Sequence, residues 1–158
     1  MATKKRSTRP ARRPAKRKAA RKRVPRPERQ QPESLRLRSV AASFTVNDLQ
    51  KSIAWYRDVM GFTVGERWEE VGRLRGIQLK AGGCDIMLSQ DDFAKGRDRK
   101  KGEGCRVWVS TVQEITAIAA RVRATGWPLD REPSETPWGD WAFMLTDPDG
   151  FKITVIQG

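Results

Sequence analysis

The positive charge of this chain is concentrated at its N-terminus, and this limits how much of the chain can fold. Residues 1–36 contain 15 Lys and Arg and 2 Glu, a net charge of 15 − 2 = +13, which is the net charge of the whole 158-residue chain. Residues 37–158 contain 17 Lys and Arg and 17 Asp and Glu, so they are neutral overall. The first segment, rich in Lys, Arg, Ala and Pro, cannot bury enough apolar surface to offset its ordering entropy. We therefore expect a disordered arm at residues 1–36 and one globular domain at residues 37–158.

The basic arm, residues 1–36, allows three interpretations that the sequence leaves open. It is a solvated tail, an arm that binds the phosphate backbone of nucleic acid without reading its sequence, or a targeting signal. The arm contains no aromatic residue, so stacking on single-stranded bases is not indicated. Its densest basic run consists of Lys16, Arg17, Lys18, Arg21, Lys22 and Arg23.

Residue types that are rare or absent exclude several classes of site. The chain has no histidine, which excludes a His-ligated metal, a Ser-His or Cys-His pair and an imidazole acid or base. Its two cysteines, Cys84 and Cys105, are too few for a disulfide framework, so we expect them to be reduced and structural. No apolar run is long enough to span a membrane, and no secretory signal is present. The expected location is the cytoplasm, with nucleoid association if the arm binds nucleic acid.

Residues 37–158 repeat one order of elements, β-α-β-β-β, in two modules at about 38–90 and 105–158, joined by a linker at 91–104. The order predicts an α+β fold. In module one the strands are predicted at 38–46, 62–70, 74–80 and 84–89, around a helix that begins at its N-cap Asp48 and ends at Gly61. In module two the strands are predicted at 105–109, 129–132, 141–146 and 151–156. The helix of module two is predicted to begin at its cap Thr111, to include Val112 and to end at Gly126. Val46 corresponds to Val109 in this alignment of the modules, and Gly83 to Gly150.

Two motifs resemble those of the vicinal oxygen chelate superfamily, which includes glyoxalase I, extradiol dioxygenases and bleomycin resistance proteins. VNDLQKSIAWYRDVMGF at 46–62 is similar to the first module of that superfamily, and PWGDWAFMLTDPDG at 137–150 to a signature of its resistance-protein-like members. The resemblance covers residues 38–158 and leaves out the arm. It implies paired βαβββ modules that form an open, barrel-like sheet of eight strands, a homodimer, and a pocket in each concave sheet.

The same resemblance carries four metal-ligand positions onto this chain. They fall on Ala41, Met87, Gly104 and Thr154, counted from Val46, Gly83, Val109 and Gly150. None of these residues offers the carboxylate, imidazole or thiolate that divalent cations prefer. With these residues at the carried-over positions, we expect no resident metal or other cofactor, and we assign no catalytic residue.

Strand alternation predicts a groove lined with aromatic side chains on the inward face of the strands. If the carried-over positions mark that face, strand alternation and the motifs give the candidate ligand-binding residues. These are Trp108, Trp141, Trp138, Met87, Ser43, Asp85 and Thr154. Indole rings supply apolar area and stacking for a planar ligand. The alternative is a structural role, with Trp55 and Trp127 in the core and Trp68 and Trp138 in a dimer contact.

The sequence thus predicts a non-enzymatic protein of the glyoxalase/bleomycin-resistance type that binds a small planar or aromatic ligand, for example an antibiotic. Two alternatives stay open. One is a metal-independent lyase or isomerase that uses Asp85, Arg106 or Ser43. The other is a nucleic-acid-associated protein in which the arm is functional and the domain is a dimeric scaffold.

Overall fold

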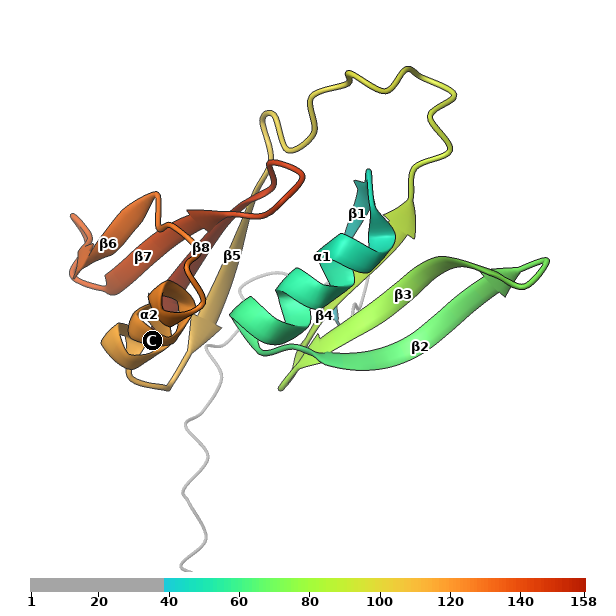
Figure 1. Cartoon of the computed structure of the whole chain (residues 1–158). Helices are drawn as coiled ribbons and strands as arrows, with labels where there is room; N and C mark the ends of the chain where they lie inside the picture. The colour runs from blue at the N-terminus through green and yellow to red at the C-terminus, as the bar shows by residue number, and fades with distance from the viewer. Residues whose placement is uncertain (1–38) are drawn as a thin grey trace, which may run out of the picture. The chain divides into compact units, whose positions relative to one another are not determined.

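The structure is a computed structural model, and it describes residues 39–158 (Figure 1). The chain divides into two units, Met1–Arg36 and Leu37–Gly158. The expected disorder of residues 1–36 and the basic run Lys16–Arg23 lie outside the described residues. No helix within residues 39–158 is long and apolar enough to cross a membrane.

The described residues form two modules with the predicted order of elements, which confirms the α+β fold class. Module one comprises β1 (Ala42–Val46), α1 (Leu49–Trp55), η1 (Tyr56–Met60), β2 (Thr63–Glu70), β3 (Arg73–Ala81) and β4 (Cys84–Gln90). Module two comprises β5 (Arg106–Thr111), α2 (Ile115–Ala124), β6 (Arg131–Glu135), β7 (Trp141–Thr146) and β8 (Lys152–Gln157). The residues between β4 and β5 contain no helix or strand, as predicted for the linker.

Each module forms one mixed sheet of four strands, and its helix crosses over between the first strand and the other three (Figure 1). The strand orders are β1-β4-β3-β2 and β5-β8-β7-β6. The first and last strands of each module pair in parallel, and the remaining pairs are antiparallel. The eight predicted strands are therefore divided equally between two sheets.

The first helix begins and ends at the residues that the sequence indicates. The Asp48 carboxylate accepts a hydrogen bond from the Lys51 backbone N–H at 3.0 Å and caps α1. The helix continues as the π-helical turn η1 and ends at Gly61, whose φ of +83° is a left-handed conformation that glycine adopts without strain.

The second helix begins later than predicted, and Thr111 does not cap it. Thr111 is the last residue of β5 and lies opposite Gln157 of β8. Glu114 is the cap, since its carboxylate accepts from the backbone N–H groups of Thr116 and Ala117. Val112, which the periodicity placed on the helix, lies in the preceding turn and is 91% exposed. The parallel pairing with β8 extends β5 by two residues and moves the helix start.

The strand predicted at 129–132 is also displaced toward the C-terminus. The structure places β6 at Arg131–Glu135, and its register with β7 shifts between Arg131 and Ser134. Pro133 lies within this shift, where a residue without a backbone N–H is tolerated because β6 is an edge strand. Leu129 packs against the core instead of pairing in the sheet.

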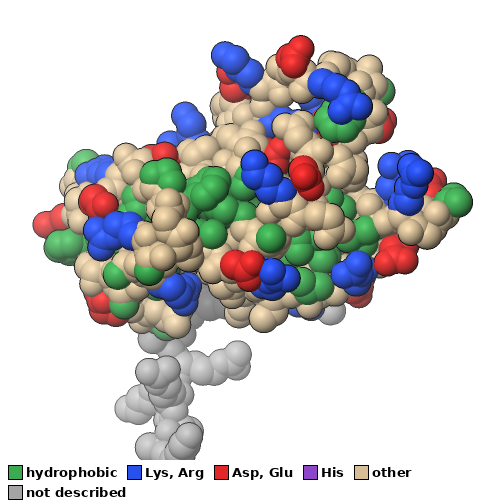
Figure 2. All heavy atoms as spheres, viewed as in Figure 1, with side chains coloured by type: hydrophobic (Ala, Val, Ile, Leu, Met, Phe, Trp, Pro, Cys, Tyr) green, Lys and Arg blue, Asp and Glu red, His purple; other side chains and the backbone are tan. Residues whose placement is uncertain are grey.

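One hydrophobic core joins the two modules. The helix-facing sides of both sheets and the apolar faces of α1 and α2 form a single buried cluster. Phe44 of β1 stacks on Phe151 of module two with ring centroids 4.1 Å apart. Trp55 is buried and Trp127 is partly buried, with ring centroids 5.4 Å apart, as the structural interpretation of these two residues predicted. On the surface, acidic and basic side chains are interspersed over the viewed face (Figure 2), in keeping with the neutral composition.

Candidate functional site on the open face of the second sheet

Strand β5 has one face toward the core and one toward solvent. Val107 and Val109 pack against the core, whereas Arg106, Trp108 and Ser110 are exposed. The register carries this alternation across the sheet, because residues opposite each other in a ladder point to the same side. We define the open face as the side of the second sheet that points away from the helices. It carries Arg106, Trp108, Ser110, Ala142, Met144, Thr146, Lys152, Thr154 and Ile156.

Two tryptophans from different elements meet on the open face. Trp108 of β5 is 50% exposed and Trp138 of the β6–β7 loop is 59% exposed. Their ring centroids lie 5.9 Å apart, with an interplanar angle of 39°. Two neighbouring, half-exposed indoles on a sheet are a typical feature of an interaction site.

The loop that presents Trp138 is held by hydrogen bonds. The Thr136 backbone N–H donates to the Asp140 carbonyl at 2.7 Å, and the Gly139 N–H donates to the Thr136 carbonyl at 3.0 Å. The Thr136 hydroxyl accepts from the Asp140 N–H at 3.1 Å. Thr136 is itself buried, so this turn is anchored beside the sheet. Asp140 contributes to this turn through its backbone N–H and carbonyl.

The guanidinium of Arg106 is the polar group beside the two indoles. Arg106 donates from Nη1 to the hydroxyl oxygen Oγ1 of Thr154 at 3.1 Å. Thr154 is fully buried, and it lies opposite Trp108 on β5 and opposite Met144 on β7. Lys152 lies opposite Arg106. Trp108, Thr154, Arg106 and Lys152 thus form one patch in which indole and cation are neighbours.

Trp141 lies on the other side of the same sheet. Along β7, Trp141 shares the helix-facing side with the buried residues Phe143 and Leu145, whereas Met144 faces the opposite side with Thr154. The structure therefore brings Trp138 to Trp108 and leaves Trp141 on the opposite face, although the sequence analysis placed all three in one groove. Trp141 is two residues from Phe143 and four from Leu145, and this even spacing is the sequence signal that the three side chains share a face.

The other three candidate residues lie on the first sheet. Ser43 is opposite Met87 in the β1–β4 ladder, and both share a face with Asp85. The Asp85 carboxylate accepts a hydrogen bond from Gln78 Nε2 at 3.0 Å. The seven candidate residues therefore divide between two sheets. Ser43, Asp85 and Met87 lie on the first sheet, Trp108, Trp138 and Thr154 at the open face of the second, and Trp141 on the other face of the second.

The ladder registers also correct the alignment of the two modules. Val46 lies opposite Gln90, seven residues after Gly83. The residue seven after Gly150 is Gln157, and it lies opposite Thr111. The structural counterpart of Val46 is thus Thr111 and not Val109. The sequence alignment matched the cap Asp48 with Thr111, whereas the α2 cap is Glu114, three residues later, and the connection before it is one residue longer than in module one.

This correction changes one of the four carried-over positions. Five residues before Thr111 is Arg106, so the position assigned to Gly104 belongs to Arg106. A guanidinium only donates hydrogen bonds and cannot ligate a metal ion. Within residues 39–158, no group of three or more Asp, Glu, Cys or His side chains is arranged to hold a metal ion.

Within residues 39–158, open clefts adjoin both sheets, and sequence reasoning had not found them. A cleft of about 520 Å³ lies over Thr45 and Ser89 of the first sheet, with the Glu70–Arg75 ion pair and the start of the linker as walls. A second cleft, of about 430 Å³, is lined by Thr146 and Lys152 of the open face and by linker residues from Lys100 to Glu103. The second cleft therefore continues the open face at the Arg106–Lys152 end.

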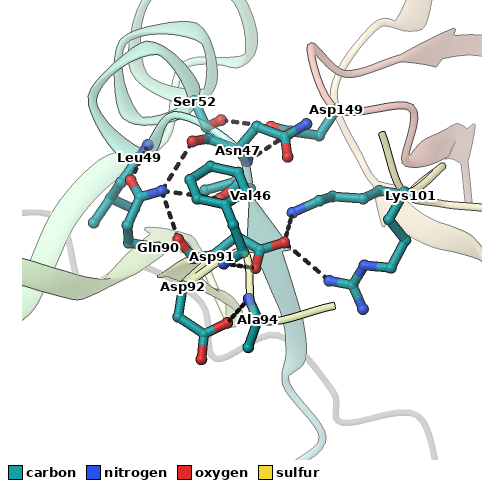
Figure 3. Close-up of polar contacts among 12 residues, drawn as sticks. Val46, Asn47, Leu49, Ser52, Gln90, Asp91, Asp92, Ala94, Lys101 and Asp149 are labelled. Carbon is teal, nitrogen blue, oxygen red and sulfur yellow. Dashed lines mark hydrogen bonds and ion pairs between the residues drawn. The ribbon is translucent and has the colours of Figure 1, made fainter. Parts of the chain in front are cut away.

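The linker that borders both clefts is fixed by a buried ion pair (Figure 3). The Asp91 carboxylate, 6% exposed, accepts from Lys101 Nζ, from the Phe93 N–H at 2.8 Å and from Arg99 Nη2 at 3.0 Å. These hydrogen bonds, that of Lys101 foremost, hold the pKa of the Asp91 carboxyl well below its usual range. Asp91, the first residue of the linker, is thus bound to Arg99 and Lys101 near the C-terminal end of the linker.

A second buried network joins the DPDG turn of module two to α1. The Tyr56 hydroxyl donates to Asp147 Oδ2 at 3.0 Å, and Asp147 also accepts from the N–H groups of Asp149 and Phe151. Asp149 in turn accepts from the Asn47 N–H at 2.7 Å and from the Ser52 hydroxyl at 2.9 Å (Figure 3). Burial raises the pKa of the Tyr56 phenol and of the Asp147 carboxyl. Both groups are enclosed by protein, so the network is structural.

The model of the Glyoxalase/Bleomycin resistance protein/Dioxygenase superfamily matches residues 37–155 of this sequence. The chain belongs to this superfamily. Solved structures of the superfamily fold agree with it over most of the domain, at identities that establish the fold alone. TioX from Micromonospora sp. ML1 is 20% identical with a TM-score of 0.61, over 75% of this chain and 98% of that one.

Two further solved structures show the same likeness. Lactoylglutathione lyase from Agrobacterium tumefaciens is 19% identical with a TM-score of 0.58, over 80% of this chain and 96% of that one. A glyoxalase/bleomycin resistance protein/dioxygenase superfamily member from Sphaerobacter thermophilus DSM 20745 is 19% identical with a TM-score of 0.60, over 76% and 98%. The comparison with curated proteins finds no match. The family and its fold are therefore shown.

Proposed function

We propose that this chain is a small-molecule-binding protein whose open face takes a planar aromatic ligand. The observation that carries the proposal is the pair of half-exposed indoles, Trp108 and Trp138, in contact on a solvent-facing sheet. A planar ring stacked on one of them gains about 0.5–1.5 kcal/mol beyond the burial of apolar area. The anchored turn that carries Trp138 supports the proposal, because a fixed aromatic group loses little entropy on binding.

The polar groups of the open face favour binding over catalysis. Arg106 is a permanently charged donor, and the Thr154 hydroxyl is buried and already accepts from it. Neither group serves as a general base or as an activated nucleophile near neutral pH. Of the residues considered for the enzymatic alternative, Asp85 is hydrogen bonded to Gln78, and Ser43 lies opposite the thioether side chain of Met87. An antibiotic with a planar ring system is one member of the proposed ligand class.

The proposal is tested by the indole N–H signals of the full chain in a two-dimensional NMR spectrum, titrated with a panel of planar aromatic compounds. Compounds that bind should shift the Trp108 and Trp138 signals. Trp108→Ala should weaken that binding at least about tenfold, which corresponds to ~1.4 kcal/mol. Trp141→Ala is the matched control, because Trp141 is 47% exposed on the opposite face of the same sheet. Equal loss in both variants, or no shift with any compound, would refute the proposal.

We further propose a homodimer and a nucleic-acid-binding role for the basic arm. The resemblance to the superfamily supports the homodimer. The net charge of +13 in residues 1–36 supports the second role, since clustered Lys and Arg bind phosphate backbones through counterion release. A ligand-binding domain carried by such an arm would be held close to nucleic acid.

A further inference from the structure

We infer that the ligand of the open face is an aromatic anion and that Arg106 determines this preference by binding its charged group. The inference rests on the proposed function, because it names the chemical class of ligand for the same face. It assigns Arg106 a specificity-determining role that the sequence analysis did not give it.

The sheet places cations immediately beside the indoles. Arg106 and Trp108 are two residues apart on β5 and therefore share the open face. Lys152 lies opposite Arg106 in the parallel β5–β8 ladder, and neighbouring strands are separated by about 5 Å. Arg131 lies opposite Met144 in the row that contains Trp108 and Thr154, and adds a third cation toward the edge of the sheet. A ring that stacks on Trp108 thus has its substituents within reach of positive charge.

The Arg106 guanidinium is oriented before any ligand arrives. Its Nη1 donates to the buried Thr154 hydroxyl at 3.1 Å, which fixes the head group against the sheet. A guanidinium has five N–H donors, so most of them are left for a ligand. A carboxylate or sulfonate accepts two such donors in a fork, and this geometry is more specific than that of a lysine.

The cations of the open face have no carboxylate partner in the described part of the chain. Arg57, Arg75 and Arg123 each form an ion pair with a nearby Asp or Glu on the protein surface. Among residues 39–158, no carboxylate oxygen lies within 4.0 Å of the charged nitrogens of Arg106 or Lys152. Within residues 39–158, Arg106 and Lys152 thus have no ion-pair partner, and an anionic ligand would supply one.

Three of the acidic residues near this face, Asp130, Asp149 and Glu103, are engaged by other groups. Asp130, at its edge, accepts a hydrogen bond from Thr146 Oγ1 at 2.5 Å. In the adjoining cleft of about 430 Å³, Asp149 accepts from Asn47 and Ser52, and Glu103 lies 3.7 Å from Lys100. An anionic group that reaches from the indoles toward Lys152 enters this cleft without meeting an unpaired carboxylate from these three residues.

Two probes that share a ring system and differ in the charge of one similarly sized substituent test the inference. 2-Naphthoate and 2-naphthamide have the same ring system, and one is an anion whereas the other is neutral. Binding of each to the full chain is measured by calorimetry, with the indole N–H shifts of Trp108 and Trp138 as the readout of location. We expect naphthoate to bind at least about tenfold more tightly than naphthamide, and Arg106→Gln to remove this difference with little effect on naphthamide.

The controls separate charge at this site from charge elsewhere. Arg73→Gln removes an exposed arginine from β3 of the first sheet and should leave both affinities unchanged. All variants keep the basic arm, so its attraction for anions is common to them. Arg106→Lys keeps the charge and loses the fork, and it should retain only part of the preference. Its melting temperature, and that of Arg106→Gln, shows whether each variant is folded.

Two results would overturn the inference in different ways. If both probes shift the Trp108 signal with equal affinity, or if naphthoate keeps its advantage in folded Arg106→Gln, Arg106 does not select an anion, and the proposed function stands without this refinement. If neither probe shifts Trp108 or Trp138, the inference fails together with the proposed function.

Discussion

Replacing Tyr56 with phenylalanine removes one hydroxyl from the buried contact between the two modules. Tyr56 is fully buried, and its hydroxyl donates at 3.0 Å to the Asp147 carboxylate, which is 3% exposed. The ring stays packed, since its edge contacts with Trp55 and Phe62, at centroid distances of 4.8 and 5.7 Å, do not involve the hydroxyl. A hydrogen bond to a charged group contributes about 1.5–3 kcal/mol, so Tyr56→Phe should lower the free energy of unfolding by that amount at pH 7. For a domain of this size, the melting temperature falls by roughly 5–15 °C.

The loss of unfolding free energy caused by Tyr56→Phe should be larger at pH 7 than at pH 4. Burial raises the pKa of the Asp147 carboxyl, so the folded protein binds this proton more tightly than the unfolded chain does. The stabilising contribution of that proton is complete below the unfolded pKa, near 3.9, and is lost as the pH rises through the folded pKa. The Tyr56 hydroxyl favours the carboxylate, so its removal raises the folded pKa further. The variant should therefore lose more stability than the parent between about pH 4 and pH 7.

Urea unfolding of the full chain, followed by tryptophan fluorescence at pH 4 and pH 7, measures both effects. Asp147→Asn removes the charge while keeping an oxygen that can accept from the Asp149 and Phe151 N–H groups. In that background Tyr56→Phe should cost less and should show no pH dependence. A deficit that is the same at both pH values, or that is unchanged in the Asp147→Asn background, would refute the assignment of this hydrogen bond as the contact that stabilises the docked DPDG turn.

Three further predictions concern the linker, the arm and the assembly. Gly102→Ala should destabilise the fold by more than about 1 kcal/mol, because Gly102 has a φ of +72° and a Cβ there would overlap the Gly150 carbonyl. Urea unfolding measures the loss, and Gly83→Ala is the control because the space around Gly83 is open. Replacing the six basic residues of the run at 16–23 with glutamine should reduce the salt dependence of binding to a duplex oligonucleotide by a slope of about 5, and an unchanged slope would contradict a role for this run. Light scattering should give about 36 kDa, twice the chain mass of 18.0 kDa, for the proposed homodimer, and a mass of one chain at all concentrations would exclude it.

The sequence predicted those elements whose signals are local. Asp48 and Gly61 lie at the two ends of α1 because an Asp cap and a glycine in a left-handed conformation act over a single turn. Strand β7 begins at Trp141 and ends at Thr146 as predicted. Thr111 has the same capping chemistry as Asp48, but it pairs with Gln157, 46 residues away, and the ladder decided its conformation. A prediction based on local chemistry fails where a distant strand competes for the same residue.

The candidate site shows the same division between local and distant signals. Strand alternation, counted from the carried-over positions, predicted an inward Trp108, and the structure places Trp108 on the open face, with Val107 and Val109 on the core side. The contact between Trp108 and Trp138, and the hydrogen bond from Arg106 to Thr154, depend on how segments 30 and 48 residues apart are brought together. No periodicity within a single segment contains this information.

The register between β5 and β8 has a chemical consequence for the open face. It places a guanidinium, hydrogen bonded to Thr154, at the pair of positions where the superfamily resemblance puts two metal ligands of module two. Arg106 supplies positive charge there, as a metal ion would, and can bind an anionic oxygen. A guanidinium has no vacant coordination position, however, so it cannot polarise a bound oxygen as a Lewis acid does. The arrangement of Arg106, Thr154 and Trp108 is therefore suited to holding an aromatic anion in its ground state.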